Sequence, residues 1–115
     1  MADDRRHPTN VEREAAARPT VAALVRALAM RDPDAMAALL RDDVAWLSAE
    51  GTEDGDAAFR RARAYFADDQ GRRWADPQQR GAHAVLRWGD TNSGAVGALV
   101  VEVRGDKVVI LCEVP

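Results

Sequence analysis

The sequence has very few of the side chains that build disulfides, metal centres and nucleophilic active sites. Its 115 residues include one cysteine, Cys112, and two histidines, His7 and His83. A single thiol cannot form an internal disulfide, and these three residues do not make a convincing zinc centre. Serine occurs only at Ser48 and Ser93, neither of them in a nucleophile motif. We therefore expect no metal ion and no other cofactor.

Long apolar runs and an excess of basic charge are also missing. The longest uncharged stretch in predicted regular structure, 94–101, is far too short to cross a bilayer, and residues 1–10 lack the apolar segment of a signal peptide. Sixteen basic and nineteen acidic residues are interspersed, so that no basic face is available for a nucleic-acid backbone. Alanine is abundant and Lys107 is the single lysine, which is typical of a GC-rich bacterial genome. We expect a cytoplasmic protein without membrane or nucleic-acid partners.

What the chain does contain is typical of one small globular domain. Apolar residues make up 47% and charged residues 30% of the sequence. Residues 1–18 are polar and rich in arginine and glutamate, and we expect them to form a loosely ordered leader. The remaining residues, 19–115, are expected to form a single domain with one hydrophobic core, because the chain is too short for two.

Helical signals come first along the chain, and strand signals follow. Asp32 is placed to cap a helix that has Pro33 at its first position, and Asp56 can cap a later one. Apolar spacing and these caps predict helices over 20–31, 33–40 and 56–67. Alternating and β-branched runs predict strands over 42–48, 71–75, 82–88, 95–103 and 108–114. The order predicts an α+β fold in which helices pack on a curved antiparallel sheet and enclose one pocket.

The register of the last strands can be predicted from their turns. A two-residue turn at Gly105-Asp106 would pair Val103 with Val108 and Ala98 with Glu113. Since side chains alternate between the two faces, this register puts only apolar residues on one face and a mixed set on the other. Both faces are too apolar for water, so one should meet the helices and the other a second copy of the chain. We therefore expect a homodimer.

Three polar residues of the mixed face are predicted to converge. Glu113 would lie near Arg87 and His83 as a cross-strand and diagonal neighbour. One interpretation is a pocket in which Glu113 and His83 act as acid and base while Arg87 orients a ligand. The other is a structural Arg87–Glu113 ion pair with His83 at the rim.

The first strand and two aromatic residues supply further candidates. Trp46, Ser48 and Glu50 share one face of the first strand, where Trp46 can fill the core or stack on a ligand, and Glu50 can be catalytic or plain loop surface. Tyr65 and Trp74 combine a broad apolar surface with a polar tip, which suits either a cavity lining or ordinary core packing.

The order of elements resembles the NTF2-like superfamily, and within it the SnoaL-like branch, including versions appended to bacterial sigma factors. The resemblance covers roughly residues 20–114 and is carried by RDPD at 31–34, LLRDDV at 39–44 and GALVVEVRGDKVVI at 97–110. It implies a cone-shaped, usually dimeric fold whose pocket lies between the helices and the concave sheet. It also implies that Leu111 and Glu113 line the pocket, which makes the mixed face concave and the apolar face the dimer surface.

The resemblance does not carry over a known active site. The isomerases of this superfamily use a general-base aspartate that falls at Ser48 here, and a helix-one tyrosine that falls near Leu24. Their protonated aspartate falls at Ala98 or Leu99. The epoxide hydrolases use an Arg-x-Asp arrangement, whereas Arg87 is followed here by Trp-Gly.

Three functions therefore stay open. The first is a non-catalytic domain that binds a small apolar molecule. The second is an enzyme of the cyclase, isomerase or dehydratase type. In that enzyme Glu113 or Glu50 would remove a proton next to a carbonyl, and Arg87, Ser48 or Trp46 would steady the enolate. The third is a regulatory domain that binds other proteins.

Overall fold

A computed structural model describes residues 9–67 and 71–115 of the chain. The described part contains three helices and seven strands, and this confirms the predicted α+β class. In chain order the elements are α1 (Asn10–Ala29), α2 (Pro33–Ala38), β1 (Leu40–Ser48), β2 (Gly51–Asp54), α3 (Gly55–Ala67), β3 (Arg72–Trp74), β4 (Gln78–Arg80), β5 (His83–Asp90), β6 (Val96–Arg104) and β7 (Lys107–Val114).

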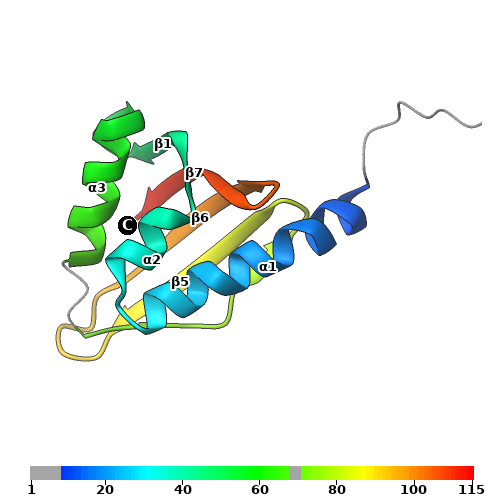
Figure 1. Ribbon diagram of the computed structural model, residues 1–115. Coiled ribbons are helices and arrows are strands. Elements are labelled where there is room, and N and C mark those ends of the chain that lie inside the picture. The colour runs from blue at the N-terminus through cyan, green and yellow to red at the C-terminus, as the bar shows by residue number, and fades with distance from the viewer. Residues whose placement is uncertain (1–8, 68–70) are drawn as a thin grey trace, which may run out of the picture.

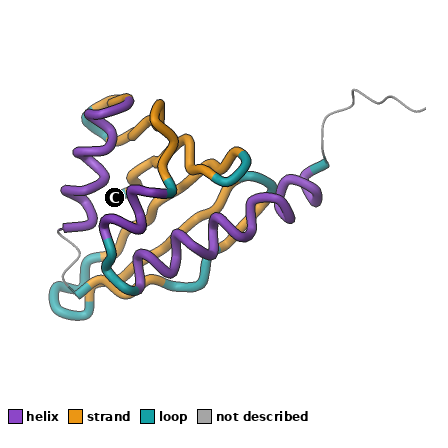
Figure 2. The backbone as a smooth tube through the Cα atoms, viewed as in Figure 1, coloured by secondary structure: helices purple, strands orange, loops and turns teal. Residues whose placement is uncertain are grey.

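All strands belong to one open sheet with the order β2-β1-β7-β6-β5-β3, and β4 pairs with β5 beside β3. Neighbouring strands are antiparallel except β1 and β7, which are parallel because the chain crosses over through α3 and the other strands. The three helices lie against one side of this sheet, with α1 across β5 and α3 near β1 and the end of β7 (Figure 1). The same two-layer arrangement is visible in the backbone trace (Figure 2).

Local capping explains where the first two helices begin. The Asp32 side chain accepts a hydrogen bond from the Ala35 amide at 3.1 Å, and Pro33 occupies the first turn, as predicted. Helix α1 begins earlier than expected, because the Thr9 hydroxyl accepts from the Glu12 amide at 3.2 Å. Residues 10–18 are therefore helical, which corrects the loosely ordered leader for that part, while residues 1–8 lie outside the described residues. None of the described helices is long and apolar enough to span a membrane.

The predicted assignment of sheet faces is wrong, because β7 contains a bulge. Val103 pairs with Val108 as expected, but Glu102 already pairs with Ile110, so that one extra residue, Val109, interrupts the alternation. Every later residue of β7 is thereby moved to the opposite face. Glu113 is opposite Leu99 instead of Ala98.

The helices cover the apolar face of β5 and β6, which was predicted to be the dimer surface. Its buried members are Ala84, Leu86, Leu99, Val101 and Val103. They join Leu24 and Leu28 of α1, Met36 of α2 and Trp46 of β1 in one core. We name this covered side the inner face and the opposite side of the sheet the outer face.

Two short strands were not predicted. Residues 50–55 were expected to form a loop, but Gly51–Asp54 pairs with Ala45–Ser48 in a hairpin. Residues 76–79 were expected to form a turn, but Gln78–Arg80 pairs with His83–Val85. Both strands are short and polar, and they lack the alternating apolar pattern on which strand prediction depends.

Candidate functional site

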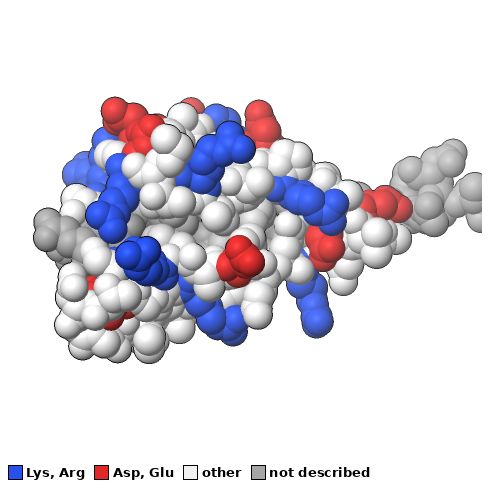
Figure 3. Space-filling view, turned by 90° about the horizontal axis from the view of Figure 1, so that it is seen from below, with Lys and Arg blue, Asp and Glu red and all other residues white. Residues whose placement is uncertain are grey.

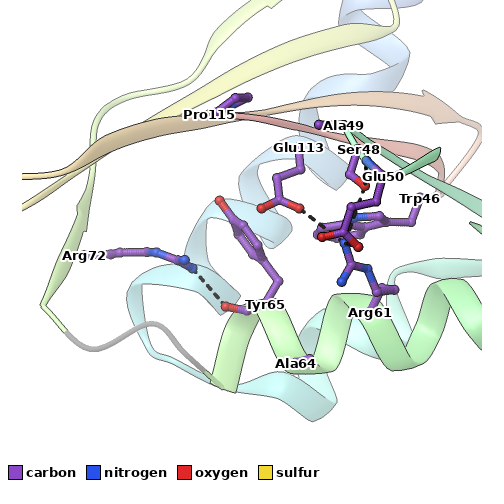
Figure 4. Close-up of a pocket in the computed structure, with 10 residues that line it drawn as sticks. All are labelled: Trp46, Ser48, Ala49, Glu50, Arg61, Ala64, Tyr65, Arg72, Glu113 and Pro115. Atoms are coloured by element: carbon purple, nitrogen blue, oxygen red, sulfur yellow. Dashed lines mark hydrogen bonds and ion pairs between the residues drawn. The ribbon is translucent and has the colours of Figure 1, made fainter. Parts of the chain in front are cut away.

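A cleft of about 330 Å³ opens between α3 and the ends of β1 and β7, and we name it the α3–β1 cleft. Its size falls in the range of small-molecule sites. Its lining comes from four parts of the chain that the fold brings together: Trp46, Ser48, Ala49, Glu50, Arg61, Ala64, Tyr65, Arg72, Glu113 and Pro115 (Figure 4).

Arg61 of α3 is the centre of the charges in this cleft. Its Nη2 atom lies 3.6 Å from Glu50 Oε2 and 3.9 Å from Glu113 Oε1, and it donates to Ser48 Oγ at 3.4 Å. Its Nε atom lies 3.0 Å from Glu53 Oε1, in a geometry that does not make a hydrogen bond. One guanidinium thus contacts three carboxylates and offsets only part of their charge. Each pair is partly exposed and contributes about 0–1 kcal/mol, so a ligand oxygen can replace one of them.

Aromatic side chains form the inner wall. Trp46 is 1% exposed, and its ring centroid lies 5.3 Å from that of Tyr65. The Trp46 Nε1 group is buried and has no hydrogen-bond partner among the described residues. A buried N–H group without a partner lowers the stability of the fold.

Arg72 enters the cleft from β3, opposite Arg61 (Figure 4). Its Nη1 atom donates to the Tyr65 carbonyl at 2.9 Å. Its guanidinium lies 4.2 Å from the Tyr65 ring centroid and 4.4 Å from that of Trp88. The Trp88 indole in turn donates to the Tyr65 hydroxyl at 2.8 Å. These contacts hold Arg72 in one orientation, which is the preorganisation that a binding site requires.

The structure brings five of the sequence-predicted site residues together in this cleft. They are Trp46, Ser48, Glu50, Tyr65 and Glu113. They converge because β1 and β7 are parallel neighbours with Trp46 opposite Leu111, so that the carboxyl ends of both strands meet beside α3.

The other predicted residues lie elsewhere. His83 and Arg87 are on the outer face, where His83 Nε2 lies 3.0 Å from Glu102 Oε1 and Arg87 hydrogen-bonds Gln78. The predicted grouping of both with Glu113 is wrong, because the bulge in β7 moves Glu113 to the inner face. Leu111 is on the inner face as expected, but it is fully buried in the core. Trp74 lines a different cleft.

Arg61 and Arg72 were missed by the sequence reasoning. Arg61 is four residues before Tyr65 in a predicted helix, so the spacing that places Tyr65 on the inner face places Arg61 there as well. No comparable signal exists for Arg72, whose place depends on the pairing of a three-residue strand with β5. Within 9–67 and 71–115, no group of three or more His, Cys, Asp or Glu residues could hold a metal ion.

Comparison with protein-family models gives no match, and comparison with curated protein sequences gives none either. Solved structures do match. One is an NTF-2 like protein of unknown function from Burkholderia xenovorans, which is 20% identical over 88% of this chain and 83% of its own, with a TM-score of 0.65.

Two further matches show how widely this architecture is used. A candidate polyketide cyclase from Xanthomonas campestris is 22% identical over 88% of this chain and 90% of its own, with a TM-score of 0.62. A de novo designed protein with a curved β-sheet is 21% identical over 88% and 86%, with a TM-score of 0.69. Since natural and designed proteins match equally well, the likeness establishes architecture and not activity. The chain has the NTF2-like fold.

Proposed function

We propose that this domain binds a small organic molecule in the α3–β1 cleft. The observation that carries the proposal is the convergence of a buried aromatic wall, Trp46 and Tyr65, with the charged groups of Arg61, Arg72 and Glu113 around one open space. Sites for small molecules combine apolar walls with a few polar groups that fix orientation.

The lining residues also indicate the chemistry of the ligand. A flat apolar part would lie against Trp46 and Tyr65, and an oxygen acceptor would take the hydrogen bonds that Arg61 and Ser48 now share. The sequence predicts an apolar ligand, whereas the charged rim favours an apolar body with a polar end. The carboxylates of Glu50 and Glu113 disfavour a strongly anionic end at this rim.

The experiment is a fragment screen followed by ¹⁵N–¹H correlation spectra. We expect carbonyl-bearing aromatic fragments to shift the Trp46 indole resonance and the amide of Glu113. Ala64→Phe should abolish these shifts, because Ala64 is exposed on the cleft wall and a larger side chain fills the space. The matched control is Ala22→Phe, an exposed helix position outside the clefts. Equal binding by both variants would overturn the proposal.

A second candidate is an enzyme that removes a proton next to a carbonyl. The observation in its favour is Glu113, a carboxylate in the cleft with 36% of its side chain exposed and Arg61 at 3.9 Å. The carboxylate could take the proton while Arg61 or Ser48 steadies the enolate oxygen.

Deuterium exchange separates this enzyme from a binding domain. If Glu113 is a base, ketone fragments that bind should exchange their α-protons in D₂O faster than they do without the protein. Glu113→Gln should remove the acceleration and retain binding. A binding domain would show no acceleration in either form.

We further propose a homodimer formed by the outer face. No described helix covers this side of the sheet, and its central apolar residues Val85, Val100 and Ile110 are only half-buried in one chain. Nearby Val96 is 74% exposed. A second copy of the chain would cover this surface. Light scattering should give twice the chain mass, and Val100→Lys should give a folded monomer; a wild-type monomer would contradict the proposal.

A further inference from the structure

A second cleft, of about 380 Å³, lies between the C-terminal end of α1 and β3, and we name it the α1–β3 cleft. One wall is apolar and comes from Val25, Leu28 and Ala29 of α1. The other lining residues are Arg31, Gly71, Arg72, Arg73, Trp74 and Thr91. Three of the nine are arginines, and none of these described lining residues is acidic. On the face shown in Figure 3, several basic side chains lie around a hollow.

Arg72 lines both clefts and stands between them. Its guanidinium carries five N–H donors, and one of its nitrogens donates a hydrogen bond to the Tyr65 carbonyl. The Tyr65 and Trp88 rings fix its plane. Among the described residues no carboxylate forms an ion pair with Arg72. It is therefore a fixed cation with donors to spare.

Arg31 and Arg73 are exposed, and neither forms an ion pair or side-chain hydrogen bond with the described residues. Asp90 on the neighbouring strand lies beside Gly71, and its Oδ1 atom accepts from the Asn92 and Ser93 amides at 2.8 and 3.2 Å. These hydrogen bonds hold the carboxylate in place without removing its charge. The three arginines that line the α1–β3 cleft still exceed this one carboxylate in charge.

The backbone at Arg31 is also unusual. Helix α1 ends in a Schellman motif. The Asp32 amide donates a hydrogen bond to the Ala27 carbonyl at 2.9 Å, and the Arg31 amide donates one to the Leu28 carbonyl at 3.2 Å. The motif needs a left-handed residue, which is usually glycine, but here Arg31 takes this conformation with φ 53°. An arginine at this position is less favourable for folding than a glycine would be.

We propose that the α1–β3 cleft binds a small amphiphilic oxyanion, a carboxylate or phosphate group on a short apolar body. The oxyanion bonds the guanidinium groups of Arg72 and Arg31, and the apolar body lies against Val25 and Leu28. Guanidinium groups match such oxyanions in geometry as well as in charge. The site is separate from the α3–β1 cleft and does not depend on the function proposed for it.

Hexanoate and its neutral isostere hexanamide test the proposal on the full chain. Hexanoate should shift the Trp74 indole resonance, and hexanamide should bind about tenfold more weakly, because it lacks the charge that strengthens hydrogen bonds to arginine. Inorganic phosphate should shift the same resonance at higher concentration, since it lacks the apolar body. Equal affinities for hexanoate and hexanamide, or no shift of this resonance by hexanoate, would overturn the proposal.

Arg31→Gly separates binding from folding. Glycine suits the left-handed position, so the melting temperature should rise or stay unchanged, while the affinity for hexanoate falls about tenfold. Arg60→Gln, which removes an exposed arginine of α3 outside both clefts, is the matched control and should leave the affinity unchanged. An unchanged affinity in Arg31→Gly would show that this arginine only complements the helix dipole, and the proposal would be wrong.

Discussion

The two clefts on either side of Arg72 contain similar groups in different electrostatic settings. Both have an arginine-rich lining and a tryptophan. In the α3–β1 cleft Arg61 is surrounded by the carboxylates of Glu50, Glu53 and Glu113. In the α1–β3 cleft no described lining residue is acidic. The neighbours of a cation therefore decide which ligand it can take, and we expect a polar neutral group in the α3–β1 cleft and an oxyanion in the α1–β3 cleft.

Removing the tryptophan of each cleft should have the largest effect on stability, and the two losses should differ between the clefts. Trp46 is 1% exposed, so Trp46→Ala leaves a core cavity and should lower the free energy of unfolding by about 3–5 kcal/mol. Trp74 is only half-buried, and Trp74→Ala should cost roughly half as much. Urea denaturation measures both. Equal losses would show that the two walls are built alike.

Replacing Arg61 by a neutral residue should have the next largest effect on stability. Arg61→Gln leaves Glu50, Glu53 and Glu113 without their shared cation, and about 1–2 kcal/mol of stability should be lost after allowing for its partial exposure. The adjacent exposed Arg60 has no carboxylate partner among the described residues, so Arg60→Gln should change stability by less than about 0.5 kcal/mol. Equal losses in chemical denaturation would contradict the central role of Arg61.

Loosening the packing around Arg72, which lies between the two clefts, should have the smallest effect on stability. It should nevertheless affect binding in both clefts. Trp88→Phe keeps an aromatic ring under Arg72 and removes the hydrogen bond to the Tyr65 hydroxyl, at a cost of about 1 kcal/mol. If the fixed position of Arg72 serves both sites, the affinity of fragments for the α3–β1 cleft and the affinity of hexanoate for the α1–β3 cleft should both fall. A change in only one of them would assign Arg72 to that cleft alone.

The sequence was sufficient for the elements whose signals are local. The Asp32 cap, the Pro33 start of α2 and the Gly105-Asp106 turn depend on neighbouring residues, and all three occur as predicted. Alternation along β1 places Trp46 and Ser48 together, whereas Glu50 reaches the cleft from the turn after β1, beside Ala49.

The sheet faces could not be predicted, because one bulged residue reverses the alternation. Val108 and Val109 are both buried, so apolar patterning gives no sign that an extra residue is present. Glu113 consequently joins the cleft, while Ile110 and Cys112 turn to the outer face. The partners predicted for Glu113, His83 and Arg87, were wrong for the same reason, and its actual partner Arg61 comes from a helix.

A crystal structure of the protein with its tightest carbonyl-bearing fragment most directly tests whether the α3–β1 cleft binds a small molecule. We expect the ring to lie against Trp46 and Tyr65, with its oxygen within hydrogen-bond distance of Arg61 or Ser48. A fragment bound in the core, on the outer face or in the α1–β3 cleft, with the α3–β1 cleft empty, would contradict it.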